Sequence, residues 1–132
     1  MVTVSVIGIC GNSVFMNVDH FHESGETVIA DSIFEEVGGK GINQAIAASR
    51  MGANVLFLTA VGDDKNGDKC KKIAKENGIN PVFKVKQGEF TPFAYILTDK
   101  NGENRVTEYG SAELEKSDVL SFEKEIASSD VL

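Results

Sequence analysis

Hydrophobic and polar residues follow a pattern that predicts strands and helices in alternation. Residues 2–10 first alternate and then run apolar, and residues 54–61 form a continuous apolar run, as in the strands of a buried sheet. Residues 42–51 are rich in small side chains and are followed by Gly52, which predicts a helix that lies close on the sheet. Residues 66–78 carry apolar side chains on one side and predict a second helix.

The same alternation continues to the last residue. Residues 81–85 begin a strand, residues 118–127 indicate a helix that Ser117 can cap, and residues 129–132 begin another strand. Strands that alternate with helices imply a parallel sheet covered by helices. The sequence therefore predicts an α/β protein.

Short strands outside this alternation indicate a second, separate β component. They fall at residues 13–18 and 27–37 and within residues 91–109. Asn101 and Gly102 lie between two of the apolar runs, and Asn-Gly at such a place is a strong hairpin signal. No repeat, low-complexity tract or linker interrupts the chain, so we expect residues 1–132 to belong to one domain.

Composition and charge exclude several classes of partner. The 132 residues carry a net charge of −7, and an acidic surface repels phosphate backbones, which argues against nucleic acid. No run approaches the roughly 20 apolar residues of a membrane span, and the first residues lack the basic region of a signal peptide. Cys10 and Cys70 are far apart without CxxC spacing, which is typical of reduced thiols in a cytoplasmic protein.

A glycine-rich turn, Gly38-Gly39-Lys40-Gly41, joins a predicted strand to a predicted helix. Glycine lets the backbone approach a ligand closely, and the helix that follows offers free N–H groups and a positive dipole end. The turn matches neither the Walker A pattern nor GxGxxG. Taken alone, it fits a tight turn without a ligand as well as it fits a binding site.

The wider sequence around this turn resembles the PfkB, or ribokinase-like, family of carbohydrate kinases. Gly38-Gly39-Lys40-Gly41-Ile42-Asn43-Gln44-Ala45, followed by Gly52 and Gly62, fits the first signature of that family at each of its fixed positions. The Gly-Gly-Lys-Gly-x-Asn form is most similar to ribokinase. The resemblance extends over nearly the whole chain, through the segments Ser24-Gly25-Glu26-Thr27, Gly62-Asp63-Asp64 and Gly110-Ser111-Ala112.

The resemblance implies a fold, an activity and partners. The fold is a Rossmann-like αβα sandwich with a small β-sheet lid whose strands lie within residues 13–37 and 91–109. The activity is transfer of the γ-phosphoryl group of ATP, with Mg²⁺, to a hydroxyl of a sugar or a related polyol or nucleoside. The substrate lies between the lid and the carboxyl ends of the sheet strands, and a homodimer forms through the lid. Apolar lid residues support the dimer, because a small sheet cannot bury them by itself: Val14, Phe15, Phe34 and Tyr95.

The resemblance also implies which residues contact the sugar. Gly38, Gly39, Lys40 and Asn43 match the turn and the helix start that line the family's sugar site. The chemistry is suitable, because an amide such as that of Asn43 both donates to and accepts from hydroxyls. The alternative for Asn43 is a helix residue that bonds to local backbone.

The first lid strand departs from the family pattern. The family commonly places an Asp five residues after the glycine that ends the first strand, where it grips two sugar hydroxyls, and this chain has Ser13 there after Gly11 and Asn12. Serine cannot make that bidentate contact. Asn12 could substitute only with a local shift, because neighbouring strand residues face opposite ways. We include Gly11, Asn12 and Ser13 in the candidate site, and this departure counts against ribose as the substrate.

The catalytic motifs of the family are not found in residues 1–132. The Gly-Ala-Gly-Asp run that holds the family's base is absent, and no Asn has a Glu three places later. We therefore expect an N-terminal portion without the catalytic half, which by itself has no activity and binds neither ATP nor Mg²⁺. One alternative is a non-catalytic module for sugar binding or dimerisation. Another is a dinucleotide-binding domain, although the glycine spacing of this chain does not match that class.

Two further groups of residues could bind metal. His20 and His22 would face one way on a strand, but no third ligand has a suitable spacing. Asp63 and Asp64 more simply solvate a strand end and cap a helix. We therefore predict no metal site in this chain.

Overall fold

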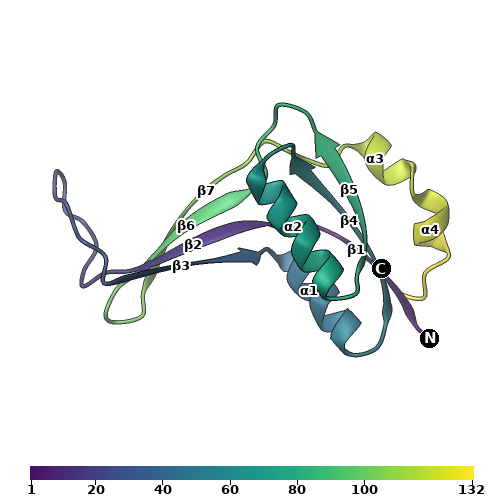
Figure 1. Ribbon diagram of the computed structural model, residues 1–132, viewed down its shortest axis with the longest axis horizontal. Helices are drawn as coiled ribbons and strands as arrows, with labels where there is room; N and C mark the ends of the chain where they lie inside the picture. Colours follow the sequence, from purple (N-terminus) through teal and green to yellow (C-terminus); the bar gives the residue numbers. More distant parts are fainter.

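Two separate sheets make up the protein, which is described here over residues 1–132 by a computed structural model (Figure 1). The first is a three-stranded parallel sheet in the order β1-β4-β5. Its strands are β1 (Thr3–Ile7), β4 (Asn54–Gly62) and β5 (Asn80–Lys86). Strand β4 lies in the middle and is buried over most of its length, as its continuous apolar run predicts.

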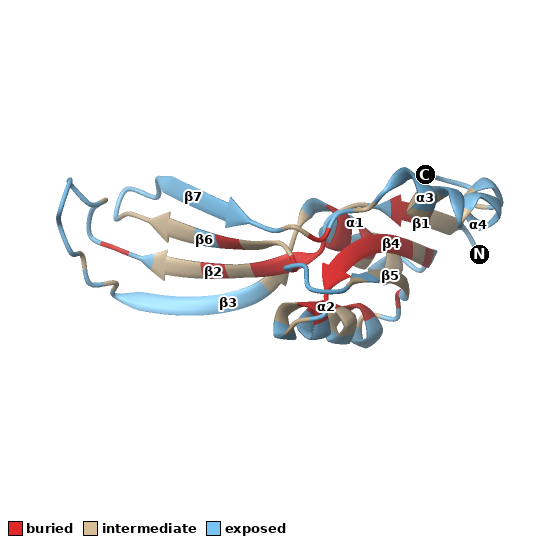
Figure 2. Cartoon of the chain, turned by 90° about the horizontal axis from the view of Figure 1, so that it is seen from above, coloured by how far each residue is buried: buried red, intermediate tan, exposed pale blue.

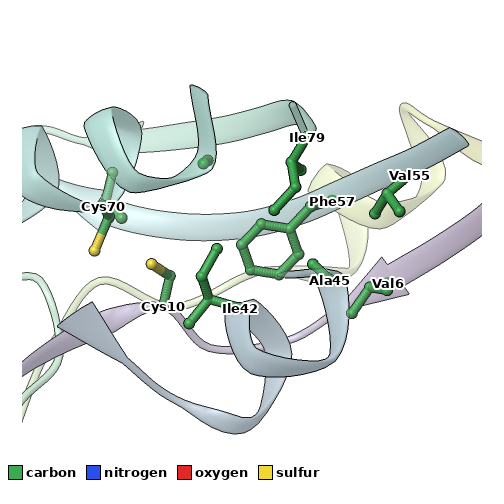
Figure 3. Close-up of a cluster of buried hydrophobic side chains, with 10 residues drawn as sticks. Val6, Cys10, Ile42, Ala45, Val55, Phe57, Cys70 and Ile79 are labelled. Atoms are coloured by element: carbon green, nitrogen blue, oxygen red, sulfur yellow. The ribbon is translucent and has the colours of Figure 1, made fainter. Parts of the chain in front are cut away.

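Helices α1 (Lys40–Arg50) and α2 (Lys65–Glu76) cover one face of this sheet. Figure 3 shows the core between them, where Phe57 of β4 packs near Ile42 of α1, and Cys70 of α2 lies nearby. Helix α2 begins where Asp64 caps it, since the Asp64 carboxylate accepts a hydrogen bond from the Gly67 N–H at 2.8 Å.

The short helices α3 (Lys116–Leu120) and α4 (Glu123–Ala127) belong to the opposite face. Phe83 of β5 packs into the core with Phe57, so Lys84, the next residue, points the other way. There the Lys84 ammonium lies 4.7 Å from the centre of the Phe122 ring, between α3 and α4. The parallel sheet is thus covered by helices on both faces, and the predicted α/β class is confirmed.

The second sheet is a four-stranded lid that extends away from the body of the molecule (Figure 2). Its order is β3-β2-β6-β7, with β2 and β6 parallel and the two outer pairs antiparallel. The strands are β2 (Gly11–Asn17), β3 (Ser32–Gly38), β6 (Phe93–Thr98) and β7 (Asn104–Tyr109). The separate β component and the β6–β7 hairpin are confirmed.

Strand β3 begins later than predicted. It starts at Ser32 rather than at residue 27, because its partner β2 ends at Asn17, opposite Ser32, and leaves nothing for residues 27–31 to pair with. The strand predicted at residues 129–132 is reduced to one parallel bridge between Val131 and Val4. No helix has the length and apolar character needed to cross a membrane.

The helix predicted over residues 118–127 is divided in two. The Ser121 hydroxyl donates to the carbonyl oxygen of Asp118, an alternative to continued helical bonding, and Phe122 leaves the helical conformation. Ser117 does not cap α3. The residue before that helix is Glu115, whose N–H donates to the Asp118 carboxylate at 2.9 Å.

Candidate functional site

A cavity of about 1130 Å³ lies where the lid joins the body. The ends of β1 and β4 and the start of α1 form one side of it, and lid strands β2, β6 and β7 form the other. Among the predicted site residues, the cavity is lined by Gly11, Asn12, Ser13, Gly38, Gly39 and Lys40. The structure therefore brings together two segments that the sequence separates by more than 20 residues.

The turn at Gly39 depends on glycine for two reasons. Its φ of 118° lies in the left-handed region, which other residues rarely adopt. A Cβ atom there would also lie 2.6 Å from the carbonyl oxygen of Ile9. That same carbonyl accepts from the Ile42 N–H at 3.2 Å, so the first turn of α1 is tied to the connection between β1 and β2.

The start of α1 offers hydrogen-bond donors to the cavity. The N–H groups of Lys40 and Gly41 precede the first helical hydrogen bond and have no backbone acceptor. The exposed Lys40 side chain adds an ammonium at the same edge. These donors and the helix dipole suit an electron-rich group such as a hydroxyl oxygen.

Ser13 and Asn12 point to opposite faces of the lid. A Cβ atom at Gly38 would lie 3.4 Å from the Ser13 hydroxyl oxygen, which puts that hydroxyl on the cavity face beside the glycine turn. The Asn12 side chain donates instead to the Glu35 carboxylate at 3.3 Å, and its buried Oδ1 has no partner. The prediction that these neighbours face opposite ways is confirmed.

Gly11 is the point where β2 leaves the body, and it is packed against Pro92. A Cβ atom at Gly11 would lie 2.3 Å from the carbonyl oxygen of Pro92, the residue before lid strand β6. The neighbouring Thr91 is buried, and its hydroxyl donates to the Asp64 carboxylate at 2.7 Å. The roots of two lid strands are thereby attached to each other and to the cap of α2.

Hydrogen bonds lower the pKa of Asp64. Partial burial acts to raise it, but the bonds that the carboxylate accepts from the Thr91 hydroxyl, the Gly67 N–H and the Thr91 N–H outweigh that effect. The prediction that this aspartate caps a helix is confirmed. Asp63 accepts from the Gly88 N–H at 2.9 Å.

Asn43 is exposed and is not among the residues that line the cavity, whereas its neighbour Gln44 is. Other lining residues that the sequence analysis did not single out are Thr59, Glu108, Tyr109 and Glu113. Glu108 could have been found only from the pairing of the lid strands, because it is almost 100 residues from Ser13 in the chain.

The two cysteines lie together in the core. Both are free and fully buried, and Figure 3 shows their sulfur atoms facing each other in the core. The hydrogen bond with Cys70 and then burial raise the pKa of the Cys10 thiol. The Cys10 thiol is therefore protonated, and both cysteines pack as small hydrophobic side chains.

The histidine segment lies away from the cavity, beyond the end of β2. The His20 ring lies 2.9 Å from Glu26 and 3.1 Å from Asp19, and bonding first to Glu26 and then to Asp19 raises its pKa. No three residues among His, Cys, Asp and Glu are grouped so that they could hold a metal ion.

Comparison with known proteins identifies the family. The sequence model described as pfkB family carbohydrate kinase matches residues 1–132. Ribokinase from Haemophilus influenzae is 32% identical over 133 aligned residues, which cover 98% of this chain and 44% of that relative. The chain therefore spans less than half the length of this relative.

Solved structures agree with the sequence match. Ribokinase from Giardia lamblia superposes with a TM-score of 0.89 at 28% identity, over 99% of this chain and 44% of that chain. Ribokinase from Cryptococcus neoformans, solved in complex with ADP, has a TM-score of 0.68 at 29% identity, over 83% of this chain and 35% of that chain. The ribokinase-like fold is thus confirmed, and the chain belongs to the pfkB family of carbohydrate kinases.

Proposed function

We propose that this chain is the sugar-binding, N-terminal part of an ATP-dependent carbohydrate kinase. The complete enzyme transfers the γ-phosphoryl group of ATP to a hydroxyl of a sugar or a related polyol or nucleoside. The family match and the named ribokinase relatives support the reaction class. The free buried thiols fit a cytoplasmic protein.

The observation that carries this proposal is the cavity between the lid and the glycine turn. Its volume of about 1130 Å³ is ample for a small molecule. Lys40 and the free N–H groups of α1 offer donors on one side, and the Ser13 hydroxyl faces them from the lid. A sugar, whose hydroxyls both donate and accept, complements such a mixed lining.

The predicted site residues take different parts in this proposal. Gly38, Gly39 and Lys40 contact the sugar from the body, and Ser13 contacts it from the lid. Gly11 and Asn12 contribute through their backbone, since the Asn12 side chain is turned toward Glu35. Asn43 stays a proposed contact, because it lies in the first turn of α1 beside Gln44, which lines the cavity.

We assign ATP and Mg²⁺ to the complete kinase and not to this chain. No three residues among His, Cys, Asp and Glu are grouped in this chain, so it offers no cage of protein ligands for a metal ion. The chain also lacks the Gly-Ala-Gly-Asp run that its family uses for the base. Phosphoryl transfer depends on positioning and charge stabilisation, so we propose that the 132 residues alone are inactive.

A second candidate function is a non-catalytic module that binds sugar or dimerises through the lid. Exposed apolar side chains on the lid favour a dimer both for a part of a kinase and for a non-catalytic module. Phe34 and Phe15 are paired across β3 and β2, and their rings stack with centroids 4.6 Å apart, yet Phe34 stays 49% exposed. Stacked rings left open to water favour burial against a second copy.

The proposal can be tested on the purified chain. We expect a panel of neutral sugars to shift the amide resonances of Gly38–Gly41, and a coupled assay to detect no sugar-dependent ADP release. Release of ADP would contradict the assigned inactivity and place catalytic groups within residues 1–132. The absence of any sugar-dependent shift would contradict the sugar site itself.

A further inference from the structure

The lid carries a carboxylate over the cavity that the sequence motifs do not assign. Ser13 pairs with Ala94, and Ala94 pairs with Glu108, so the three residues form one row across β2, β6 and β7. Directly paired residues project from the same face of a sheet. All three line the cavity, and the Ser13 hydroxyl of this row lies beside the glycine turn, so this face is the roof of the site.

Glu108 is the acidic member of this roof. Ser13 has one short neutral hydroxyl, and Ala94 has no polar side-chain atom. The Glu108 side chain is exposed and takes part in no hydrogen bond or ion pair within the chain. Glu108 and Ser13 are two strands apart, which is about 10 Å at the usual strand spacing. Their side chains therefore stand on opposite sides of the space beneath the roof.

The two sides of the cavity therefore complement each other chemically. The body offers donors from the start of α1 and from Lys40, while the lid offers a carboxylate acceptor at Glu108. A carboxylate accepts from two hydroxyls through its two oxygens, and it repels phosphate and carboxylate groups. This lining selects an uncharged polyhydroxylated molecule.

We propose that Glu108 is a specificity-determining residue that grips two hydroxyls of a neutral sugar and excludes phosphorylated sugars. It supplies from β7 the carboxylate that Ser13 lacks on β2. The inference rests on the proposed sugar site and adds to it a lid residue and a class of substrate.

The test compares Glu108→Gln with Glu36→Gln in the 132-residue chain. Glu36 is the matched control, because it pairs with Ser13 at the other end of the same row but does not line the cavity. Both glutamates are exposed and unpaired, so neither change removes a contact from the fold. Titration calorimetry with D-ribose, D-xylose and D-ribose 5-phosphate measures affinity, and circular dichroism checks folding.

We expect Glu108→Gln to lower the affinity for the neutral sugar that binds best by at least about fivefold, because a charge-assisted hydrogen bond becomes a neutral one. The same change should raise the affinity for the phosphorylated sugar, and Glu36→Gln should alter neither. Equal sugar affinities for wild type and Glu108→Gln overturn this inference and leave the sugar site standing. Failure of the wild type to bind any neutral sugar overturns the proposed function itself.

Discussion

The Lys69 ammonium of helix α2 lies 2.6 Å from the Glu35 carboxylate of lid strand β3. The same carboxylate accepts from the Asn12 amide at 3.3 Å, so three elements meet at one group. Bonding to Lys69 and then to Asn12 lowers the pKa of Glu35, so this carboxylate is charged at neutral pH. This contact joins the body to the lid next to the candidate site.

Lys69→Met should loosen the lid without altering the cavity wall. Both partners are about half exposed, so we expect a modest loss of sugar affinity, within a factor of about 5. Hydrogen exchange at β3 amides should become faster, and the difference from wild type should shrink at high salt.

Lys72→Met is the matched control, because Lys72 pairs with Glu76 inside α2 at 3.8 Å and does not touch the lid. Faster exchange in β3 for both variants would show that the effect comes from α2 in general. Unchanged hydrogen exchange of the β3 amides in Lys69→Met would show that the ion pair does not hold the lid in position.

Asn43→Ala should weaken sugar binding more than Lys40→Ala. An amide held in the first helical turn both donates and accepts, whereas the Lys40 ammonium sits on a flexible stem. Loss of a polar partner in a closed site costs on the order of 1–3 kcal/mol, which calorimetry resolves. A loss of affinity in Gln44→Ala with none in Asn43→Ala would transfer the role to Gln44, which lines the cavity.

Thr91→Val should destabilise the junction between lid and body. It removes a buried hydroxyl that donates to Asp64 and accepts from the Gly62 N–H at 2.9 Å. We expect the free energy of unfolding to fall by about 1–3 kcal/mol, measured by urea titration. Thr98→Val, which breaks an exposed hydrogen bond to Asn104, should cost much less.

The Asp64 carboxylate should also make the free energy of unfolding depend on pH in the acidic range. Its pKa in the folded protein lies below the ordinary value of 3.8, so its contribution is fully present above that value and is lost as pH falls through the lowered pKa. Asp64→Asn should flatten the decrease of stability below about pH 4. Asp31→Asn, at an exposed aspartate outside the strands, should leave the acid profile unchanged.

Phe34→Asp should weaken self-association through the lid. Sedimentation of the full-length protein at micromolar concentration should show a dimer that Phe34→Asp weakens, because the charge disrupts the exposed stack with Phe15. Ile29→Asp is the control, since Ile29 is also exposed but precedes β3 and lies outside the lid strands. A wild-type monomer would contradict the proposed dimer.

The family and the class of fold could be read from the sequence, because both depend on local features. The Gly38–Gly41 turn needs residues that tolerate φ of 118° and a close carbonyl, and only glycine does so. The apolar run of β4 likewise reflects burial on both faces of a parallel sheet. Such local constraints leave a pattern that can be recognised without coordinates.

The arrangement of the site was decided by tertiary structure. Pairing of β2 with β6, and of β6 with β7, puts Glu108 in one row with Ser13, although no motif links the two residues. The sequence predicted that Asn12 faces away from Ser13, and only the structure shows that its side chain reaches Glu35, the partner of Lys69. Strand register, and the surroundings that each side chain meets, arise from contacts between distant segments. A pattern of neighbouring residues does not contain those contacts.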